Sequence, residues 1–458
     1  MSDPGIAVDQ QAPPTSAGLD PWLDYIARIH PREIEMGLGR VGRVASRLAL
    51  AKPATTVITV AGTNGKGSTV KTLEAMLEAA GFSTGAYTSP HILRFNERIR
   101  LRAEDASDAQ IVASFARIEA ARGADSLSYF EFTTLAALLL FADSGLDFAL
   151  LEVGLGGRLD AVNLIDPDLC VITNISLDHE DWLGKGRENI GAEKAGILRR
   201  GVPFLLGDRD PPASVLNAAQ ALGIEPLRIG QDFAAFEAAE QWSARLVSAS
   251  GGMNLTPLRR PHLMLDNVVV ALQALASLGV LPPTSVINEV LSTLSLAGRF
   301  ERRIVADSGC GVVLDVAHNP DAAEALAQRL RSEEGNARLH MVFAVMADKA
   351  VEDIVRSLES LVDIWYIAHF DGERAQSAQG LEARILDAAP AAIVRRFESV
   401  ERAFCAACED AAASIDYARC VSSSDESAAA PLIVVTGSFH TLAEITALPS
   451  LLRPPPGH

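Results

Sequence analysis

The stretch VITVAGTNGKGSTVKTLEAML, residues 57–77, decides the fold. It begins with a run of β-branched and apolar residues that predicts a buried strand, and a helical pattern at 67–80 follows a short glycine-rich turn. A common phosphate-binding loop reads G-x-x-x-x-G-K-[ST]. Here Val60 stands where the first glycine belongs, and Gly67 separates Lys66 from the next hydroxyl. The stretch therefore predicts a strand, an altered phosphate loop and a helix.

The chemistry of this loop favours an anion. A strand that ends in glycines and opens a helix presents backbone N–H groups, and the helix dipole adds positive potential there. Lys66 would bring a charge to the β- and γ-phosphates, and Ser68 or Thr69 could face a magnesium ion. A lysine at a helix start is also disfavoured by the dipole unless an anion is present. Although glycine turns before helices are common, we interpret this one as a nucleotide site.

Length and charge restrict the class of protein. At 458 residues the chain predicts two domains of roughly 100–200 residues or more. The net charge of −18 argues against a binder of nucleic acid or of membrane surfaces, because both need a basic face. No apolar run approaches the roughly 20 residues of a membrane span. Residues 1–18 are expected to form a flexible tail without a cleavable signal, so we expect a cytoplasmic protein.

The cysteines indicate a reduced protein. They number five and are scattered, which is typical of an intracellular chain. Cys405 and Cys408 have C-x-x-C spacing, but they lie in an alanine-rich stretch that predicts an ordinary helix. No second pair completes a zinc site. We interpret the two residues as part of that helix.

Strand-like runs alternate with helical patterns, which predicts mostly parallel sheets covered on both faces. In the first half the expected strands are 57–61, 147–153, 169–174 and 203–206, and the expected helices are 67–80, 108–121 and 130–143. The stretch SLAGRFERR (295–303) predicts a hinge, after which the alternation returns. The fold class is therefore α/β, with a tail over 1–18, an N-terminal P-loop-type domain over 19–297 and a smaller Rossmann-like domain over 298–458.

Polar residues follow several predicted strands. Glu152 closes a strand before the glycines of LEVGLGGRLD, where a carboxylate at the sheet edge is placed to hold Mg²⁺. His179 follows another strand, and Lys194 lies on a short predicted helix. Taken alone, His179 reads as a structural histidine and Lys194 as a surface lysine. Asp315 and His318 follow a strand in the C-terminal half, just before a proline that opens a helix.

Together these motifs resemble the folylpolyglutamate synthase/dihydrofolate synthase family, whose members are relatives of the Mur ligases. The resemblance covers nearly the whole chain from residue 20 onward and rests on YIARIHPREIEMGLGRV, VAGTNGKGS, TSPHILRFNERIRL, SLSYFEFTTLAALLLF, LEVGLGGRLDA, LDHEDWLG, EKAGI, AGRFE, DVAHNP and GSFHT. Gly67 is itself a mark of the family, because Mur ligases place Ser or Thr directly after the loop lysine. The altered loop is therefore expected to bind phosphate.

The resemblance implies ATP bound between two α/β domains, two Mg²⁺ sites and possible use of a monovalent cation. Positions that match ATP-binding residues are Thr63, Asn64, Gly65, Lys66, Gly67, Ser68, Asn267, Arg299, Asp315 and His318. Positions that match metal ligands are Ser89, Glu152, His179 and Lys194, the last as a lysine that carries CO₂ as a carbamate. The catalytic candidates are Lys66, Lys194, His179 and Glu152. Asn267 lies in DNVVVAL, which departs from the family's N-A-x-x-A pattern.

The activity that the resemblance implies is an ATP-dependent ligation. The γ-phosphoryl group of ATP activates a substrate carboxylate as an acyl phosphate, and the amine of L-glutamate displaces phosphate. Bifunctional members join glutamate to dihydropteroate and then extend folates. Positions that match their dihydropteroate-binding residues are Glu33, Ile34, Glu35, Met36, Ser128, Tyr129, Phe130, Glu131 and Leu159. We favour the bifunctional enzyme over a synthase that only extends folates, and we expect a monomer.

Two rival functions come from other classes. A Mur-type ligase that acts on a UDP-linked peptide normally carries an extra N-terminal domain, and about 55 residues before the loop are too few for one. A nucleotide-binding switch or sensor would bind or hydrolyse a nucleotide without a second substrate. The guanine-reading N-K-x-D pattern of such switches is absent from the sequence. No covalent nucleophile is expected, since phosphoryl transfer depends on positioning and charge neutralisation.

Overall fold

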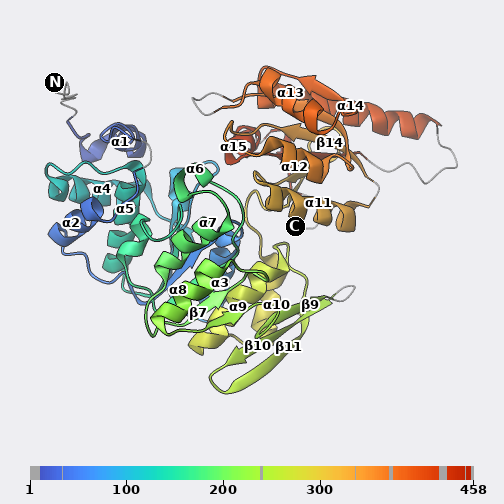
Figure 1. Ribbon diagram of the computed structural model, residues 1–458. Helices are drawn as coiled ribbons and strands as arrows, with labels where there is room; N and C mark the ends of the chain where they lie inside the picture. Colours follow the sequence, from blue (N-terminus) through green and yellow to red (C-terminus); the bar gives the residue numbers. More distant parts are fainter. Residues whose placement is uncertain are drawn as a thin grey trace. The chain divides into compact units, whose positions relative to one another are not determined.

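The chain folds into two compact units in the computed structural model (Figure 1), which describes residues 11–32, 35–237, 241–335, 337–370, 375–421, 431–448 and 450–454. The first unit holds Met1–Ile175 and His179–Leu294, and the second holds Ser176–Asp178 and Ser295–His458. The sequence-based boundary falls after residue 297, whereas this division falls after residue 294. Each unit is an α/β structure with a mostly parallel sheet, which confirms the predicted fold class.

The main sheet of the first unit has the strand order β4-β3-β2-β5-β1-β6-β7-β8. Its strands are β1 (Ala54–Ala61), β2 (Thr84–Tyr87), β3 (Ile99–Leu101), β4 (Glu104–Asp105), β5 (Leu146–Glu152), β6 (Leu169–Ile172), β7 (Phe204–Leu206) and β8 (Pro226–Arg228). All pairs from β2 to β8 along this order are parallel, and β3 and β4 add an antiparallel edge. Near-continuous apolar runs form β1, β5 and β6 because helices cover both faces of these strands.

Helices cover both faces of this sheet. They are α1 (Leu19–Ile26), α2 (Gly39–Arg47), α3 (Lys66–Ala79), α4 (Asp108–Arg122), α5 (Tyr129–Ser144), α6 (Glu180–Leu183), α7 (Arg187–Lys194), α8 (Ala213–Leu222), α9 (Leu265–Leu278) and α10 (Thr284–Thr293), with 3₁₀ turns at Thr15–Ala17, Phe95–Arg98, Ala161–Leu164 and Ala195–Ile197. One core cluster joins α1, α2, α4, α5, α7 and α8 to one face. α3 and α9 contact β1, β5 and β7 and share no residue with that cluster, so they pack on the other face.

A second, antiparallel sheet in the first unit was not predicted from the sequence. It consists of β9 (Ala234–Glu237), β10 (Gln241–Ser248) and β11 (Gly251–Arg259) in the order β11-β10-β9. β11 buries only Leu255 and Leu258, and its other residues are exposed or half-buried. Such a strand carries little of the apolar alternation by which a strand is predicted.

The second unit repeats the layered plan with the strand order β16-β15-β14-β17-β13-β12-β18. Its strands are β12 (Glu301–Val305), β13 (Gly311–Leu314), β14 (Arg338–Phe343), β15 (Val362–Ile367), β16 (Val394–Arg396), β17 (Pro431–Thr436) and β18 (Leu452–Arg453). Its helices are α11 (Pro320–Glu334), α12 (Val351–Leu358), α13 (Ala378–Ala388), α14 (Val400–Val421) and α15 (Phe439–Thr446). Met341 and Phe343 of β14 face α11, α12 and α13, whereas Val342 faces α14 and α15.

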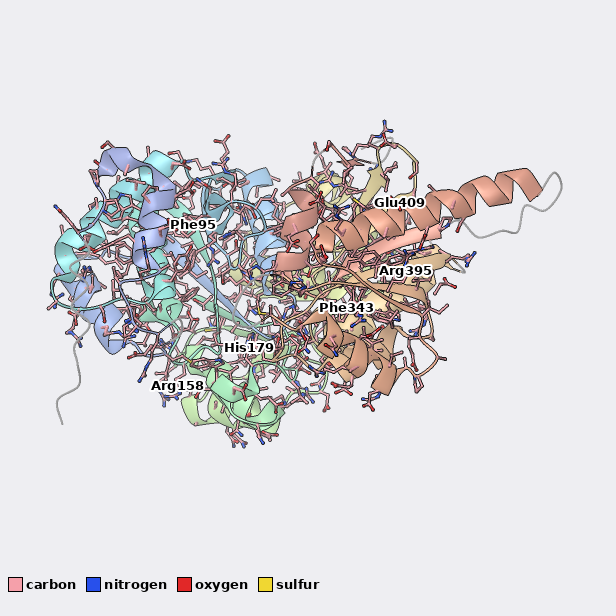
Figure 2. The ribbon with its side chains drawn as sticks, turned by 90° about the horizontal axis from the view of Figure 1, so that it is seen from above. Phe95, Arg158, His179, Phe343, Arg395 and Glu409 are labelled. Carbon is pink, nitrogen blue, oxygen red and sulfur yellow. The ribbon has the colours of Figure 1, made fainter. Side chains whose placement is uncertain are left out.

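Two predictions in the second unit have different outcomes. The stretch 295–303, predicted as a hinge, begins at the division between the units and belongs to the second unit, and its last three residues are part of β12, which pairs with β13. Cys405 and Cys408 lie on α14 as free thiols, on the helix that carries Glu409 in Figure 2. Burial raises the pKa of the Cys408 thiol to about 12, so the thiol stays protonated and unreactive at neutral pH.

No helix among the described residues has both the length and the apolar composition that a bilayer span needs. Two of the sequence-based site residues, Glu33 and Ile34, lie outside the described ranges. The stretch 421–430 is predicted by its composition to be a surface loop, but Val421 is the last residue of α14, and residues 422–430 lie outside the described ranges.

We predict that Gly85→Ala destabilises the first unit. A Cβ atom at this position of β2 would lie 2.6 Å from Leu146 Cδ1 and 2.7 Å from Phe141 Cδ1, both in the packed core. Overpacking of this kind costs about 1–3 kcal/mol of unfolding free energy, measurable by urea denaturation. Gly252→Ala on β11 is the control, because the atom nearest to a Cβ at this position would be the backbone oxygen of Leu246, 4.0 Å away. Equal stability of the two variants would contradict the packing described here.

Candidate active site

Only glycine fits the backbone at two positions of the loop between β1 and α3. Gly62 has a φ of 148° and Gly65 a φ of 83°, which L side chains rarely adopt. A Cβ atom on Gly62 would lie 1.8 Å from Thr173 Oγ1, and one on Gly65 would lie 2.2 Å from Asn267 Oδ1. The turn is therefore packed closely against the end of β6 and against α9.

Hydrogen bonds from the segment after β6 fix the shape of this loop. The backbone N–H of Thr63 donates to the carbonyl of Asn174 at 2.9 Å, and that of Asn64 donates to Asn174 Oδ1 at 2.7 Å. The hydroxyl of Thr173 donates to the carbonyl of Asn64 at 2.6 Å. The loop is thus held rigidly before any ligand binds, which lowers the ordering cost of binding.

The start of α3 fits an anion. Gly65 is the N-cap, and no side chain caps this end of the helix. The first N–H groups of an α-helix point out of its N-terminus, and in α3 this first turn contains Lys66, Gly67 and Ser68. Thr69 Oγ1 is buried and has no hydrogen-bond partner among the described residues. A buried, orphaned hydroxyl beside an uncapped helix start fits a phosphate group and its metal ion.

Two lysine side chains converge on the same loop carbonyl. Lys66 Nζ donates to the carbonyl oxygens of Gly62 and Thr63, each at 3.1 Å. Lys194 Nζ donates to the carbonyl oxygen of Gly62 at 2.8 Å. Lys194 is only 4% exposed, so the reading of this residue as a surface lysine is wrong. Because the two ammonium groups stand beside the helix start, the loop carries a local positive charge in an acidic protein.

A buried carboxylate lies next to this loop. Glu152 ends β5, pairs in register with Val60 of β1 and is 5% exposed. Its Oε2 accepts the backbone N–H of Ser89 at 3.1 Å, which brings two predicted metal ligands together. Asp160, also buried, accepts the N–H groups of Leu155 and Val162 at 2.9 Å. Burial raises the pKa of Asp160 to about 6, partly offset by its backbone hydrogen bonds.

His179 has a strained backbone. It is the N-cap of α6 and adopts φ 54° and ψ 34°, the left-handed region that side chains other than glycine rarely enter. The carbonyl oxygen of His179 accepts the N–H groups of Trp182 and Leu183 at 3.0 Å, so this conformation starts a single helical turn. Strain at a polar residue is typical of a functional position.

The predicted metal ligands offer a donor set that suits a hard cation. Mg²⁺ prefers oxygen ligands, and Glu152 with Ser89 supplies a carboxylate and a hydroxyl. Across the described ranges, no three His, Cys, Asp or Glu side chains gather in an arrangement that could hold a metal. Two of the four predicted ligands, Ser89 and Lys194, are not His, Cys, Asp or Glu, so they do not count toward such a group.

The remaining predicted nucleotide residues belong to the second unit. Asp315 follows β13 and accepts the N–H groups of Phe300 at 2.8 Å and Ala317 at 2.9 Å. Burial raises the pKa of Asp315, and the charge of Arg299 opposes that shift. His318 Nδ1 donates to the carbonyl oxygen of Val316 at 2.8 Å, since a carbonyl can only accept. These polar groups stand at the carboxyl end of β13, just before α11 begins with Pro320.

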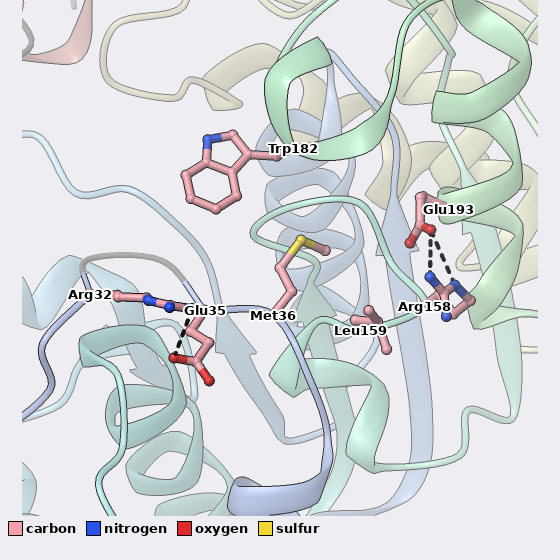
Figure 3. A pocket seen from close by; sticks show the side chains of 7 residues that line it. All are labelled: Arg32, Glu35, Met36, Arg158, Leu159, Trp182 and Glu193. Atoms are coloured by element: carbon pink, nitrogen blue, oxygen red, sulfur yellow. Dashed lines mark hydrogen bonds and ion pairs between the residues drawn. The ribbon is translucent and has the colours of Figure 1, made fainter. Parts of the chain in front are cut away.

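A pocket of about 530 Å³ opens in the first unit (Figure 3). Its lining residues are Arg32, Glu35, Met36, Arg158, Leu159, Trp182 and Glu193. Three of them, Glu35, Met36 and Leu159, are sequence-based candidates for the dihydropteroate site. Figure 3 shows Met36 and Leu159 at the base, the indole of Trp182 across from Met36, and an ion pair at either end. Arg158 and Glu193 form one of these pairs at 2.7 Å.

A chain of charged groups supports one wall of this pocket. Arg40 of α2 contacts Glu35 Oε1 and lies 3.2 Å from both carboxylate oxygens of Glu131. His30 Nε2 is 3.1 Å from Glu35 Oε2. The hydrogen bond from Arg40 lowers the pKa of Glu35, so this carboxylate is charged at neutral pH. Glu131 also accepts the N–H of Ser128 at 2.8 Å, in the capping box of α5.

The other predicted pocket residues lie at the start of α5. The ring of Phe130 packs on Gly154, where a Cβ atom would lie 2.5 Å from its Cζ, and stands 5.9 Å from the ring of Tyr87. Tyr129 lies under the guanidinium of Arg98 at 5.7 Å. Ser128, Tyr129, Phe130 and Glu131 are not among the residues that line the pocket, and Glu131 reaches it only through Arg40.

Sequence reasoning did not select several of the residues that line the pocket. Arg32, Trp182 and Glu193 were not candidates. The signal that could have identified Trp182 is an aromatic residue in the otherwise polar stretch HEDWLGKG, between a candidate ligand and two glycines. Figure 2 labels Arg158, which lines the pocket, and His179, which lies three residues before Trp182 in the sequence.

Two sequence profiles match the chain. The Mur ligase middle domain matches residues 60–256, and the Mur ligase glutamate ligase domain matches residues 298–424. The fold and the site therefore define an ATP-dependent ligase of the Mur type, which joins an acid to an amino acid.

Curated relatives narrow this class. The chain is 40% identical over 436 residues to the dihydrofolate synthase/folylpolyglutamate synthase of Escherichia coli (strain K12), which covers 95% of this chain and 96% of that protein. It is 35% identical over 444 residues to the protein of the same name from Haemophilus influenzae, with 93% and 96% covered. The chain belongs to the dihydrofolate synthase/folylpolyglutamate synthase family, as its motifs predicted.

Solved structures agree with this assignment. E. coli FolC in complex with DHPP and ADP has a TM-score of 0.83 and 38% identity, with 95% of this chain and 98% of that chain covered. A bifunctional folylpolyglutamate synthase/dihydrofolate synthase with Mn, AMPPNP and L-glutamate bound has a TM-score of 0.82 and 40% identity, with 96% of this chain and 100% of that chain covered.

We predict that Arg40→Met strongly destabilises the first unit. The Glu131 side chain is 4% exposed, and the variant would leave its charge buried without the cation, at a cost of about 3 kcal/mol in urea unfolding. Arg40→Met combined with Glu131→Gln should recover part of the loss. Arg43→Met on the same helix is the control, because Arg43 is 56% exposed and pairs at the surface with Asp125. A stable Arg40→Met variant would contradict a structural role for the pair.

Proposed function

We propose that this chain joins L-glutamate to dihydropteroate and adds further glutamates to folates, with ATP as co-substrate. The observation that carries the proposal is the rigid glycine turn at 62–65, with two lysine side chains and a buried carboxylate around it. A site of this kind suits transfer of a phosphoryl group, which depends on neutralised charge and on positioning. The relatives' names and their bound nucleotides, DHPP and glutamate support the same activity.

The proposed reaction proceeds in two steps. An oxygen of the acceptor carboxylate attacks the γ-phosphorus of ATP, and ADP leaves with the bridging oxygen. The amine of L-glutamate then attacks the acyl carbon, phosphate leaves, and the amine proton passes to solvent. Thr63, Asn64, Gly65, Lys66, Gly67 and Ser68 hold the phosphates in this proposal, and Lys66 neutralises the charge that develops on the transferred group. Asn267, Arg299, Asp315 and His318 are the further nucleotide-binding residues.

Divalent metal would supply further charge neutralisation to the phosphates when it is bound. We assign Ser89, Glu152, His179 and Lys194 to its two sites, with Lys194 as a carbamate and a monovalent cation nearby. The burial of Lys194 supports a modified side chain, because a carbamate turns a buried cation into an oxygen ligand. Isotopically labelled bicarbonate, followed by NMR on the wild type and on Lys194→Ala, tests this assignment. A carbamate signal that persists in the variant would exclude Lys194.

The acceptor pocket distinguishes the bifunctional enzyme from one that only extends folates. Glu35, Met36 and Leu159 are the dihydropteroate candidates in the pocket, and we assign Ser128, Tyr129, Phe130 and Glu131 to its supporting wall. A relative from Lacticaseibacillus casei, 32% identical over 386 residues with 79% of this chain and 89% of that protein covered, is named folylpolyglutamate synthase. The higher identity to the E. coli and H. influenzae relatives, 40% and 35%, supports both activities, and we propose a monomer.

One experiment separates these functions. Purified protein is incubated with ATP, Mg²⁺, labelled L-glutamate and either dihydropteroate, tetrahydrofolate or no acceptor, and products are identified by mass. Glutamylation of both acceptors is the expected result. Glutamylation of tetrahydrofolate alone would indicate the folate-extending enzyme. ATP consumption without any acceptor would indicate a nucleotide switch or sensor.

We predict that Lys66→Ala and Glu152→Ala each lower product formation by about 10²-fold or more, because Lys66 neutralises charge on the transferred group and Glu152 is assigned to hold the divalent metal. Circular dichroism and thermal melting should show that the fold persists. Lys52→Ala is the matched control, since Lys52 is 48% exposed, pairs with Asp168 and stands outside the proposed site. Near-normal turnover in either site variant would overturn the assignment of these residues.

A further inference from the structure

Trp182 differs from every other tryptophan of the chain. The sequence has four tryptophans, of which Trp22, Trp242 and Trp365 are 2%, 3% and 1% exposed. Trp182 is 48% exposed, and it lines the pocket of the first unit. Single exposed apolar residues are ordinary on protein surfaces. An indole that forms the wall of a cavity is a different case, because a bound molecule would cover it.

The backbone holds Trp182 in place without burying its ring. α6 is a single turn that begins after His179 and ends at Leu183, and Gly184 caps it with a φ of 90°. Leu183 points into the core and is 6% exposed, and a Cβ atom on Gly156 would lie 2.9 Å from its Cδ2. The adjacent Trp182 is therefore anchored by its neighbour while the indole stays at the pocket. A fixed aromatic side chain offers contact area at a low entropic cost.

The pocket opposite Trp182 suits a flat ring. Figure 3 shows Met36 across from the indole and Leu159 beyond Met36, so a planar molecule between Trp182 and Met36 would have an aromatic contact on one face and an apolar contact on the other. A methionine sulfur makes favourable contacts with aromatic rings. Glu35 stands at one end, where its carboxylate would accept hydrogen bonds from ring N–H or amino groups. Arg158 stands at the other end, and its guanidinium suits the carboxylate of an acidic molecule.

We propose that Trp182 is a specificity-determining residue, whose indole stacks on the flat bicyclic ring of the acceptor and selects acceptors that carry such a ring. The identity of the acceptor as a pteroate or folate rests on the proposed function. Trp182 does not take part in phosphoryl transfer in this proposal. Its loss therefore changes the KM for the acceptor rather than kcat, and it leaves the KM values for ATP and glutamate unchanged.

Intrinsic fluorescence tests the contact directly. The purified protein, without ATP, is titrated with dihydropteroate while acrylamide quenching of its tryptophan emission is measured. Because the other three tryptophans are buried, most of the acrylamide-sensitive emission comes from Trp182. Ligand should protect this emission, and Trp182→Phe should remove the protected component. Unchanged acrylamide quenching at saturating dihydropteroate would overturn the proposal.

Variants test the energetic contribution. Trp182→Ala should weaken dihydropteroate binding, measured by calorimetry, by about 10-fold, and should raise the KM for dihydropteroate by a similar factor. Trp182→Phe keeps an aromatic face and should stay within about threefold of the wild type. Phe236→Ala is the matched control, because Phe236 is a 50% exposed aromatic residue on β9, outside the pocket. Thermal melting checks that every variant folds.

The outcomes separate this proposal from the proposed function. Wild-type ligation of dihydropteroate together with unchanged binding in Trp182→Ala would overturn the role of Trp182 alone. Failure of the wild type to bind or ligate dihydropteroate would overturn both. An equal loss of affinity for dihydropteroate and ATP in Trp182→Ala would indicate a general structural defect, and would also overturn the stacking role.

Discussion

The carbonyl oxygen of Gly62 is the point on which the rest of the site depends. Lys66 and Lys194, from α3 and α7, both donate to it, although the two residues lie far apart in the sequence. Their convergence requires that the loop turn sharply, and the turn is possible because Gly62 packs directly against Thr173 with no room for a Cβ atom. The glycine turn at Gly62 therefore connects β1, the end of β6, α3 and α7.

Local arrangement explains how a protein with a net charge of −18 can attract anions. Many of its cations are engaged in surface pairs, such as Arg43 with Asp125 and Lys52 with Asp168. Such pairs contribute little and are screened by salt. Lys66 at the glycine turn is half-buried beside an uncapped helix start, where the helix dipole adds to its positive charge. Composition alone therefore says little about the charge of the site.

Much of the fold could be predicted because its strands are continuous apolar runs. The runs at 57–61 and 147–153 became β1 and β5, and the glycine turn marked the carboxyl edge where the polar residues gather. The sheet of β9, β10 and β11 was missed, because a mostly exposed strand such as β11 carries no clear apolar pattern. The local sequence indicates which residues of one element are buried, but it does not indicate which other elements pack against them.

The same limit explains which site residues could be found. The loop glycines and Glu152 stand at predicted strand ends, so their neighbourhood follows from the topology of a parallel sheet. The sequence around Lys194, taken alone, predicted an exposed lysine, because nothing near this residue in the sequence indicates that its side chain reaches Gly62. Trp182 lines a pocket with residues from three other segments, and the pairing of Arg40 with Glu131 also joins distant segments. These contacts exist only in the folded chain.

The tight approach of Gly65 to Asn267 has an evolutionary consequence. Asn267, in its proposed role at the nucleobase, touches the turn that is proposed to hold the phosphates, with no space between them for a single methyl group. A bulkier residue at 267, chosen to accept a different base, would push the turn out of shape. Drift toward another nucleotide is therefore blocked at this position, because Gly65 has no side chain whose loss could make room for a larger residue at 267.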